Sequence, residues 1–317
     1  MSGLRGTAVA IALLLAALAT AGCGLGPGAD VGSVELSVTR EFGAEPGLRR
    51  AVEAKESDTV MRVLEASAEI ETRFGAGFVH SIDGVAEGER GGDPYDWFFF
   101  VDGVESPVGA TEVEARGGER IWWDYRNWSA ANHVPAVVGS WPAPFVEGVA
   151  GKRYPVVVEC ASHGSFVLSE RTKEPRACEL TREALEREGV ELADERPEKA
   201  IRVLVGTWDD LRDDAAAGLI EAGPAESGVY ADFETTGDGY EVLALDERGA
   251  RARRLGTDAG LVAATSRYSG APVWVVTGGT DGAVRAAAES LDAEHLRDHY
   301  AVAIEDGKGT PLPVEVR

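Results

Sequence analysis

The sequence predicts two folded parts: an α+β module near the N-terminus, whose sheet packs on one helix, and an α/β domain after it. The length of 317 residues is enough for two domains at about 150 residues each. In the first part, one helical pattern is followed by short apolar runs, two of which end in Asp-Gly. In the second part, strand-like and helix-like runs alternate, which is typical of an α/β sheet.

The composition limits the function before any motif is considered. Hydrophobic residues make up 44% and charged residues 27% of the chain, as in an ordinary folded soluble protein. The 54 acidic residues outnumber the 31 basic ones, for a net charge of −23. Binding to nucleic acid or to anionic lipid needs clusters of Lys and Arg, and we find none in the sequence. We therefore expect no nucleic-acid partner.

Residues 1–22 predict a secretory signal peptide. Arg5 precedes an uncharged run rich in Ala and Leu, and this run of about 15 residues is shorter than the roughly 20 that a membrane span needs. The segment LATAGC, residues 18–23, resembles a bacterial lipobox. That resemblance implies cleavage before Cys23 and diacylation of its thiol. The alternative is an ordinary signal peptide with a chance cysteine.

A lipid-modified Cys23 would hold the protein on the outer face of the bacterial cytoplasmic membrane, because two acyl chains suffice for stable anchoring. Residues 23–32 contain Gly and Pro without an apolar pattern, so we expect a flexible tether. Cys160 and Cys178 then remain, and an exported compartment favours a single disulfide between them. Free thiols, and a metal or Cys–His site that includes His163, stay open as alternatives.

The module over residues 33–130 begins with a strand, in which Val34, Leu36 and Val38 alternate with polar residues. Residues 59–72 have the apolar spacing of an amphipathic helix, with Asp58 or Thr59 as its cap. Further strands are expected over 78–82, 97–101 and 120–125, and the first two of these run into Asp-Gly turns. This order of elements predicts a small sheet packed on one helix.

Four segments of this module resemble the transcobalamin C-terminal-like domain, a bacterial family of surface domains related to the cap of transcobalamin and intrinsic factor. They are FVHSIDGV (78–85), YDWFFFVDG (95–103), VGA (108–110) and GGERIWWDY (117–125). The resemblance covers about residues 33–128. It implies a β-grasp-like fold on a secreted or lipid-anchored protein. It also implies a role near vitamin or corrinoid uptake, with a corrinoid as the candidate ligand; no other cofactor is expected.

The rest of the chain divides into a linker and the α/β domain. Residues 131–152 are rich in Pro and Gly and predict either a linker or a loop packed on the first module through Trp141 and Phe145. Within 153–317, strands are expected over 155–159, 201–205, 229–233, 240–245, 273–276 and 300–304. Helices are expected over 179–188, 208–222 and 282–291.

Aromatic residues are the strongest candidates for ligand binding. The set is Trp97, Phe99, Trp122, Trp123, Tyr125, Trp128 and Trp141. Because neighbouring residues of a strand point to opposite faces, Trp122 and Trp123 cannot share one core. One face of the strand should pack on the helix. The other either offers aromatic surface to a ligand or packs on the second domain.

Signals for catalysis or metal binding are weaker. The turn over 277–281 (TGGTD) is able to cradle an anion or simply to cap a helix. Carboxylates at helical spacing over 209–214 suit either a cation or a solvated face. His295 and His299 lack the Glu of a zinc-binding HExxH motif, and no GxSxG segment occurs. We therefore assign no catalytic residues and no metal ligands.

The sequence thus predicts a membrane-anchored, non-enzymatic surface lipoprotein that binds a ligand or partner, as an accessory to nutrient uptake of the corrinoid type. Its partners would be the membrane, through Cys23, and a small molecule, a transporter or another envelope protein. The alternative is an adhesion or scaffold protein whose aromatic residues are all core. An enzyme with its site in the C-terminal domain is a less favoured third hypothesis.

Overall fold

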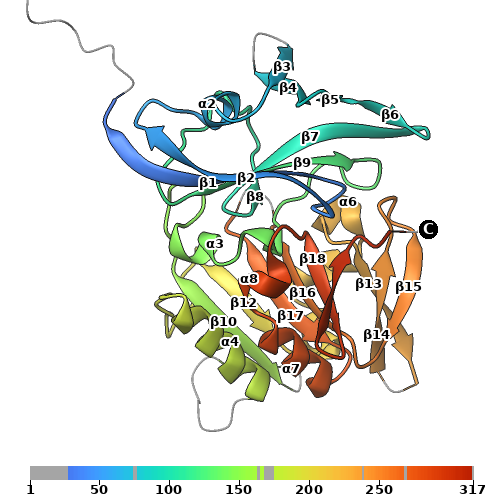
Figure 1. The fold of residues 1–317 in the computed structure, drawn as a ribbon. Coiled ribbons are helices and arrows are strands. Elements are labelled where there is room, and N and C mark those ends of the chain that lie inside the picture. The colour runs from blue at the N-terminus through green and yellow to red at the C-terminus, as the bar shows by residue number, and fades with distance from the viewer. Residues whose placement is uncertain are drawn as a thin grey trace, which may run out of the picture.

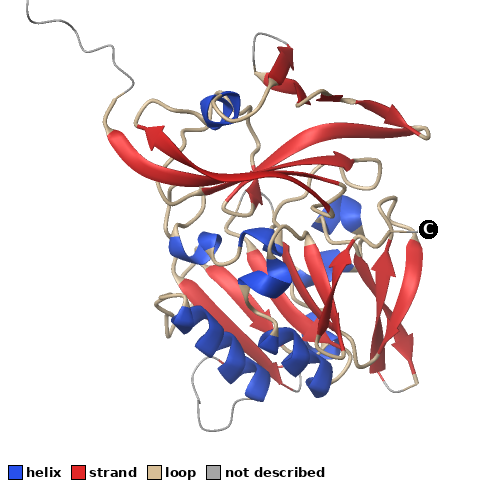
Figure 2. Ribbon diagram, in the orientation of Figure 1, coloured by secondary structure: helices blue, strands red, loops and turns tan. Residues whose placement is uncertain are grey.

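The computed structural model describes residues 28–73, 77–162, 165–167, 175–237, 239–267 and 270–315. The predicted signal peptide, Cys23, most of the tether and His163 lie outside these residues. Strands predominate and helices are mixed among them (Figure 2). Figure 1 shows the N-terminal sheet lying across one end of a layered C-terminal body. No helix in the described ranges is long and apolar enough to span a membrane.

The N-terminal half contains a large sheet, a small sheet and one helix. The elements are β1 (Asp30–Arg40), β2 (Glu45–Lys55), α2 (Val60–Glu65), β3 (Ile70–Arg73), β4 (Phe78–Ile82), β5 (Val85–Ala86), β6 (Gly88–Arg90), β7 (Asp93–Val101), β8 (Val104–Glu105) and β9 (Arg120–Asn127). The large sheet has the order β2-β1-β9-β7-β6, with β8 also on β7. Strands β1 and β9 are parallel, and β7 pairs antiparallel to β9. The small sheet has the order β3-β4-β5.

The strands predicted over 78–82, 97–101 and 120–125 are confirmed, and the cap at Thr59 is confirmed because its side chain accepts from the Arg62 N–H. The predicted helix 59–72 is wrong beyond Glu65. Ile70 instead pairs with Ile82, and this strand pairing overrides local helical spacing. Strand β2 was not predicted. It is an edge strand with mostly exposed side chains, so it lacks a core-facing apolar pattern.

The C-terminal half is built on a mixed sheet with the order β11-β10-β12-β17-β16-β18-β19, beside a smaller sheet β13-β14-β15. Its strands are β10 (Val156–Ser162), β11 (Ser165–Val167), β12 (Ile201–Val205), β13 (Ala231–Thr236), β14 (Gly239–Leu245), β15 (Arg251–Gly256), β16 (Gly260–Thr265), β17 (Val273–Gly278), β18 (Ala301–Glu305) and β19 (Lys308–Leu312). Strands β10, β12 and β17 are parallel, whereas β16, β18 and β19 pair antiparallel.

Short and longer helices surround this sheet. They are η1 (Val138–Ser140), α3 (Ala143–Val146), α4 (Arg176–Arg187), α5 (Trp208–Leu211), η2 (Ala217–Ile220), α6 (Pro224–Ser227), α7 (Asp281–Glu289) and α8 (Ala293–Leu296). Helices α4 and α7 lie together against one face of the sheet (Figure 1). The single helix predicted over 208–222 is wrong. Asp214 accepts hydrogen bonds from the N–H groups of Ala216 and Ala217, and this local turn competes with helix formation.

The segment 131–152 is buried between the two halves. Val134, Val137 and Val138 are at most 1% exposed. Trp141 and Phe145 pack on Trp274 of the C-terminal half, with ring centroids 5.6 and 5.0 Å away, in a cluster against which Val104 of the N-terminal module also packs. The predicted domain boundaries remain a prediction. Described residues from both sides of this segment belong to one hydrophobic core.

Strand β9 joins the halves through its opposite faces. Trp122 packs edge-on against Tyr300, with centroids 5.4 Å apart, in a core that also includes residues of the C-terminal half. Trp123 stacks on Phe99 at 4.8 Å in the core beneath α2. The expectation that the two tryptophans point to opposite faces is confirmed. The outer face meets the C-terminal half, which is the second of the two alternatives for that face.

A buried carboxyl stands at the centre of this contact. Asp124 accepts hydrogen bonds from the Thr39 hydroxyl (2.6 Å), the Gly43 N–H (3.1 Å) and the Tyr300 hydroxyl (3.1 Å). Trp122 donates its indole N–H to Thr39 at 2.7 Å. Burial raises the pKa of Asp124 to about 6, although these hydrogen bonds favour its charged form. Buried hydrogen bonds therefore add to apolar packing where the two halves meet.

We expect Trp122→Ala to lower the free energy of unfolding by about 3–5 kcal/mol, because it leaves a cavity between the halves. Trp128→Ala is the matched control. Its side chain is 38% exposed, so its effect should stay within about 0.5 kcal/mol. Urea denaturation followed by far-UV circular dichroism measures both. Equal losses in the two variants would contradict the burial of Trp122 at a shared core.

Asp124 also predicts a pH dependence. Its pKa is about 6 in the folded protein against an ordinary 3.8, so the folded protein binds this proton more readily than the unfolded chain does. Its contribution to the free energy of unfolding therefore falls as the pH rises from about 4 to about 6. Urea denaturation across this window should show the wild type losing stability relative to Asp124→Asn. A difference that does not vary with pH would contradict the assignment.

Candidate ligand-binding groove

A groove of about 560 Å³ lies against strand β7. Its lining comes from the start of β4, the middle of β7 and the connection after β8. The residues are Gly77, Phe78, Val79, Glu87, Asp96, Trp97, Phe98, Phe99, Glu105, Ser106, Pro107, Val108, Gly109, Ala110, Glu112 and Trp123. Because successive residues of a strand face opposite sides, a groove that touches all of residues 96–99 runs along the strand's edge.

This edge of β7 is only partly paired. On its other side, β7 pairs with β9 from Tyr95 to Val101. On the groove side, β6 pairs with residues 93–95 and β8 with residues 100–101. Among the described residues no strand pairs with 96–99 on this side. Residues 85–86, which could have continued the pairing, instead form β5 and pair with β4.

Main-chain polar groups of Trp97 and Phe99 are directed at this edge. The Phe99 carbonyl accepts from the Ser106 N–H at 3.2 Å, just where β8 ends. Since alternate residues of a strand direct their N–H and C=O groups to the same edge, those of Trp97 face the groove as well. The Trp97 N–H donates to the side chain of its own neighbour, Asp96, at 2.7 Å. The Asp96 carboxylate therefore accepts the hydrogen bond from the Trp97 N–H that a further strand would otherwise accept.

The walls of the groove carry exposed apolar side chains above an aromatic floor. Phe78 is 64% and Val108 44% exposed, and both belong to the small set of large apolar side chains that the described residues leave exposed. Beneath them, Trp97, Phe99 and Trp123 are at most 8% exposed. Exposed apolar groups gathered in a concave site are typical of ligand-binding surfaces.

Carboxylates supply all the charge on this lining, and none of its described residues is basic. Glu105 is engaged: it accepts from the Val134 N–H (2.7 Å) and lies 3.4 Å from Arg126. Glu87 pairs with Arg73 at 2.5 Å. Asp96 and Glu112 have no ion pair among the described residues. Burial raises the pKa of Asp96, although the hydrogen bond from the Trp97 N–H and the charge of Arg126 on the neighbouring strand act to lower it.

The structure separates the seven predicted aromatic residues into groups. Trp97, Phe99 and Trp123 line the groove from below, and Tyr125 lies in the same core. Trp122 and Trp141 are buried elsewhere, and Trp128 is partly exposed but does not line the groove. Sequence reasoning missed Phe78, Val108, Asp96 and Glu112. The alternation in residues 78–82 was a usable signal for a strand, but it did not show which end of that strand is exposed.

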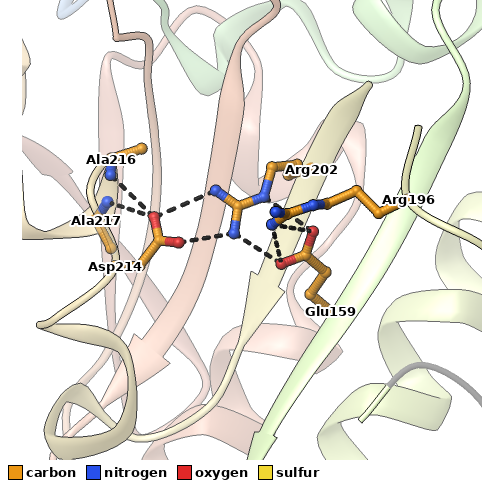
Figure 3. Close-up of polar contacts among 6 residues, drawn as sticks. All are labelled: Glu159, Arg196, Arg202, Asp214, Ala216 and Ala217. Atoms are coloured by element: carbon orange, nitrogen blue, oxygen red, sulfur yellow. Dashed lines mark hydrogen bonds and ion pairs between the residues drawn. The ribbon is translucent and has the colours of Figure 1, made fainter. Parts of the chain in front are cut away.

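The carboxylates predicted over 209–214 have a structural role at Asp214. Figure 3 shows Arg202 between Asp214 and Glu159, with Arg196 also reaching the Glu159 carboxylate. Arg202 lies 2.7 Å from each of the two carboxylates. Burial alone would raise the pKa of Asp214, but its hydrogen bonds to Arg202 and to main-chain N–H groups lower it. Glu159 is 2% exposed, so this ion-pair network compensates a buried charge.

The other polar candidates are likewise occupied. Thr280 caps α7 by accepting from the Ala283 N–H. At Gly279 a Cβ atom would lie 1.9 Å from the Tyr240 carbonyl oxygen, so the turn is packed against the chain. His295 contacts Asp292 at 3.0 Å, and burial lowers the pKa of His299. Within the described ranges, no three His, Cys, Asp or Glu side chains are grouped to hold a metal ion.

The predicted disulfide between Cys160 and Cys178 is confirmed, with the two Cα atoms 6.0 Å apart. It links β10 to α4 within the C-terminal half, whereas the groove is lined only by residues of the N-terminal half. Both side chains are at most 1% exposed. Its role is therefore structural, and it takes no part in the groove.

Comparison with known proteins gives limited matches. Residues 57–127 match the model of a family described as a domain of unknown function, DUF4430; the match begins just before α2 and ends with β9. No curated protein matches the chain. One similar solved structure is described as a "putative metal binding protein" from Ruminococcus gnavus ATCC 29149. It is 12% identical and covers 30% of this chain and 97% of its own, with a TM-score of 0.24. That score is too low to support an argument.

Arg202→Met should lower the free energy of unfolding by about 3 kcal/mol, because it leaves the buried Glu159 carboxylate without its main partner. Arg196→Met is the control. Arg196 contacts the same carboxylate, but its side chain is 52% exposed, so we expect a loss of at most about 1 kcal/mol. Thermal and urea denaturation measure both. Similar losses in the two variants would contradict the role given to Arg202.

Proposed function

We propose that this protein is a non-enzymatic binding protein on the bacterial cell surface, and that the groove along β7 takes its ligand or partner. The observation that carries the proposal is the groove itself. It joins exposed apolar side chains, four carboxylates without a basic residue among the described lining, and a partly unpaired strand edge in one concave site. Its volume falls within the range of about 300–1,000 Å³ typical of ligand pockets.

Attachment to the membrane is part of this proposal. The lipobox-like segment at residues 18–23 supports acylation of Cys23, and residues 23–32 would then connect the anchor to β1. Two acyl chains hold a protein on a bilayer without a spanning helix. The protein would thus present its groove outside the cytoplasmic membrane, where a ligand or a transporter is accessible.

The resemblance to the transcobalamin C-terminal-like family supports a role as an accessory to corrinoid-type uptake. The motifs that carry it span residues 78–125 and lie inside the segment that matches the family model. A sheet with the parallel pair β1–β9 at its centre and α2 against it is compatible with the β-grasp-like fold that this resemblance implies. A corrinoid is accordingly the first small molecule to test.

An adhesion or scaffold function is the second candidate. It is favoured by the burial of Trp97, Phe99, Trp122, Trp123, Tyr125 and Trp141, which leaves only Trp128 of the predicted set partly exposed. An enzyme with its site in the C-terminal half has less support, because Asp214 and Thr280 are explained by structural contacts. The binding proposal is preferred because it accounts for Phe78, Val108 and the carboxylates beside them.

We expect the tryptophan fluorescence of the full chain, purified in detergent, to change saturably with cobinamide or cobalamin if a corrinoid is the ligand, because Trp97 and Trp123 line the groove. Phe78→Ser should abolish the change, since it removes the exposed wall.

Val31→Ser is the matched control for this titration. Val31 is also exposed but lies outside the groove, so the variant should behave as wild type and corrects for absorption of light by the corrinoid. A saturable change that Phe78→Ser abolishes supports direct corrinoid binding. No change at high micromolar ligand would contradict it and leave a polypeptide partner as the occupant to test.

A further inference from the structure

The groove side of β7 has the form of an incomplete sheet. Strand β6 covers one end of this edge and β8 the other. No described strand pairs with residues 96–99 between them, although the Phe99 carbonyl accepts from the Ser106 N–H. An open edge presents main-chain donors and acceptors in the pattern that pairs with another strand. At a rise of about 3.3 Å per residue, four residues give an open length of roughly 13 Å. That length suits a short extended segment.

We propose that the groove binds an extended polypeptide segment that carries basic side chains and adds to the open edge of β7 as a short strand. The inference rests on the proposed binding function of the groove and specifies the class of its partner. Two independent features support it: the direction of the main-chain groups and the charge of the lining.

The hydrogen-bonding groups of Trp97 define where the added strand would pair. Its N–H is bonded to the Asp96 side chain, and a partner carbonyl would take that donor over. Asp96 is then released to accept from a basic side chain. A cross-strand residue lies on the same face as the residue that it opposes, so a Lys or Arg opposite Asp96 meets the carboxylate directly.

The lining favours alternation in the partner. Residues 97 and 99 belong to the apolar core beneath α2, so a partner residue opposite Trp97 should be apolar. Asp96 and Phe98 lie on the other face. The lining contains four carboxylates and no described basic residue, and of these Asp96 and Glu112 have no ion pair among the described residues. A partner with the pattern basic–apolar–basic complements both the faces and the charge.

The test uses isothermal titration calorimetry on the full chain in detergent at physiological salt, with three peptides. The first is Ac-Thr-Lys-Val-Lys-Thr-NH2. The second replaces both Lys by Glu, and the third carries an N-methyl group on Val, which removes the N–H that would bond to the Trp97 carbonyl. We expect the first to bind, and the other two to bind at least about tenfold more weakly, as loss of a charged or main-chain hydrogen bond implies.

Matched variants locate the binding. Asp96→Asn and Glu112→Gln should each weaken binding of the basic peptide several-fold, and Phe78→Ser should abolish it. Glu65→Gln removes an exposed carboxylate on α2 outside the groove and should leave binding unchanged. Because Glu112 is exposed, its variant remains informative even if Asp96→Asn disturbs the fold.

Each outcome separates this inference from the proposed function. Equal affinity for the basic and acidic peptides overturns the charge preference, and equal affinity for the N-methylated peptide overturns strand addition. If no peptide binds while cobinamide binds in a Phe78-dependent manner, the polypeptide inference fails and the binding function stands. If neither the peptides nor a corrinoid binds, both fail.

Discussion

Every residue of β9 is buried, and the rest of the structure depends on this strand satisfying two different surroundings at once. One face completes the core beneath α2, and the other packs against the C-terminal half. Charged residues of the second face need partners in such a place: Arg120 lies 2.7 Å from Asp298, and Asp124 accepts from Tyr300. A shift by one residue would exchange the two faces and leave these charges unpaired, so the polar contacts fix the register of the join.

The groove follows from how the neighbours of β9 are arranged. Strand β7 uses one edge to pair with β9, and the hairpin to β8 covers only the far end of its other edge. That hairpin turns at Asp102 and Gly103, whose φ angles of 50° and 80° suit a two-residue turn. Glu105, which follows, lines the groove and also holds Arg126 and the Val134 N–H at the join. One residue of the groove lining is therefore tied directly to the contact between the two halves.

Sequence patterns predicted those strands and helices whose structure is determined by their own local residues. Alternation placed Trp122 and Trp123 on opposite faces, but it could not show what covers the outer face, because Tyr300 is distant in sequence. Local spacing failed at Ile70, where pairing with Ile82 prevails, and at Asp214, whose side chain forms a turn by accepting from the Ala216 N–H. The sequence predicted the buried aromatic residues of the groove but not the exposed apolar residues that line it. An exposed Phe has no periodic signal that separates it from a core residue.

Burial of most of the predicted aromatic residues favours a scaffold at first sight, yet a binding protein needs the same burial. A groove recognises its occupant at low entropic cost only if its floor is already ordered, and Trp97, Phe99 and Trp123 are held in a packed core. The two functions differ in the side chains that they require at the rim of the groove. A scaffold gains nothing from a Phe78 side chain left 64% exposed in the same groove as Asp96, a half-buried carboxylate with no ion pair among the described residues. An exposed apolar side chain and a carboxylate outside any described ion pair are both better satisfied by an occupant that is apolar and basic.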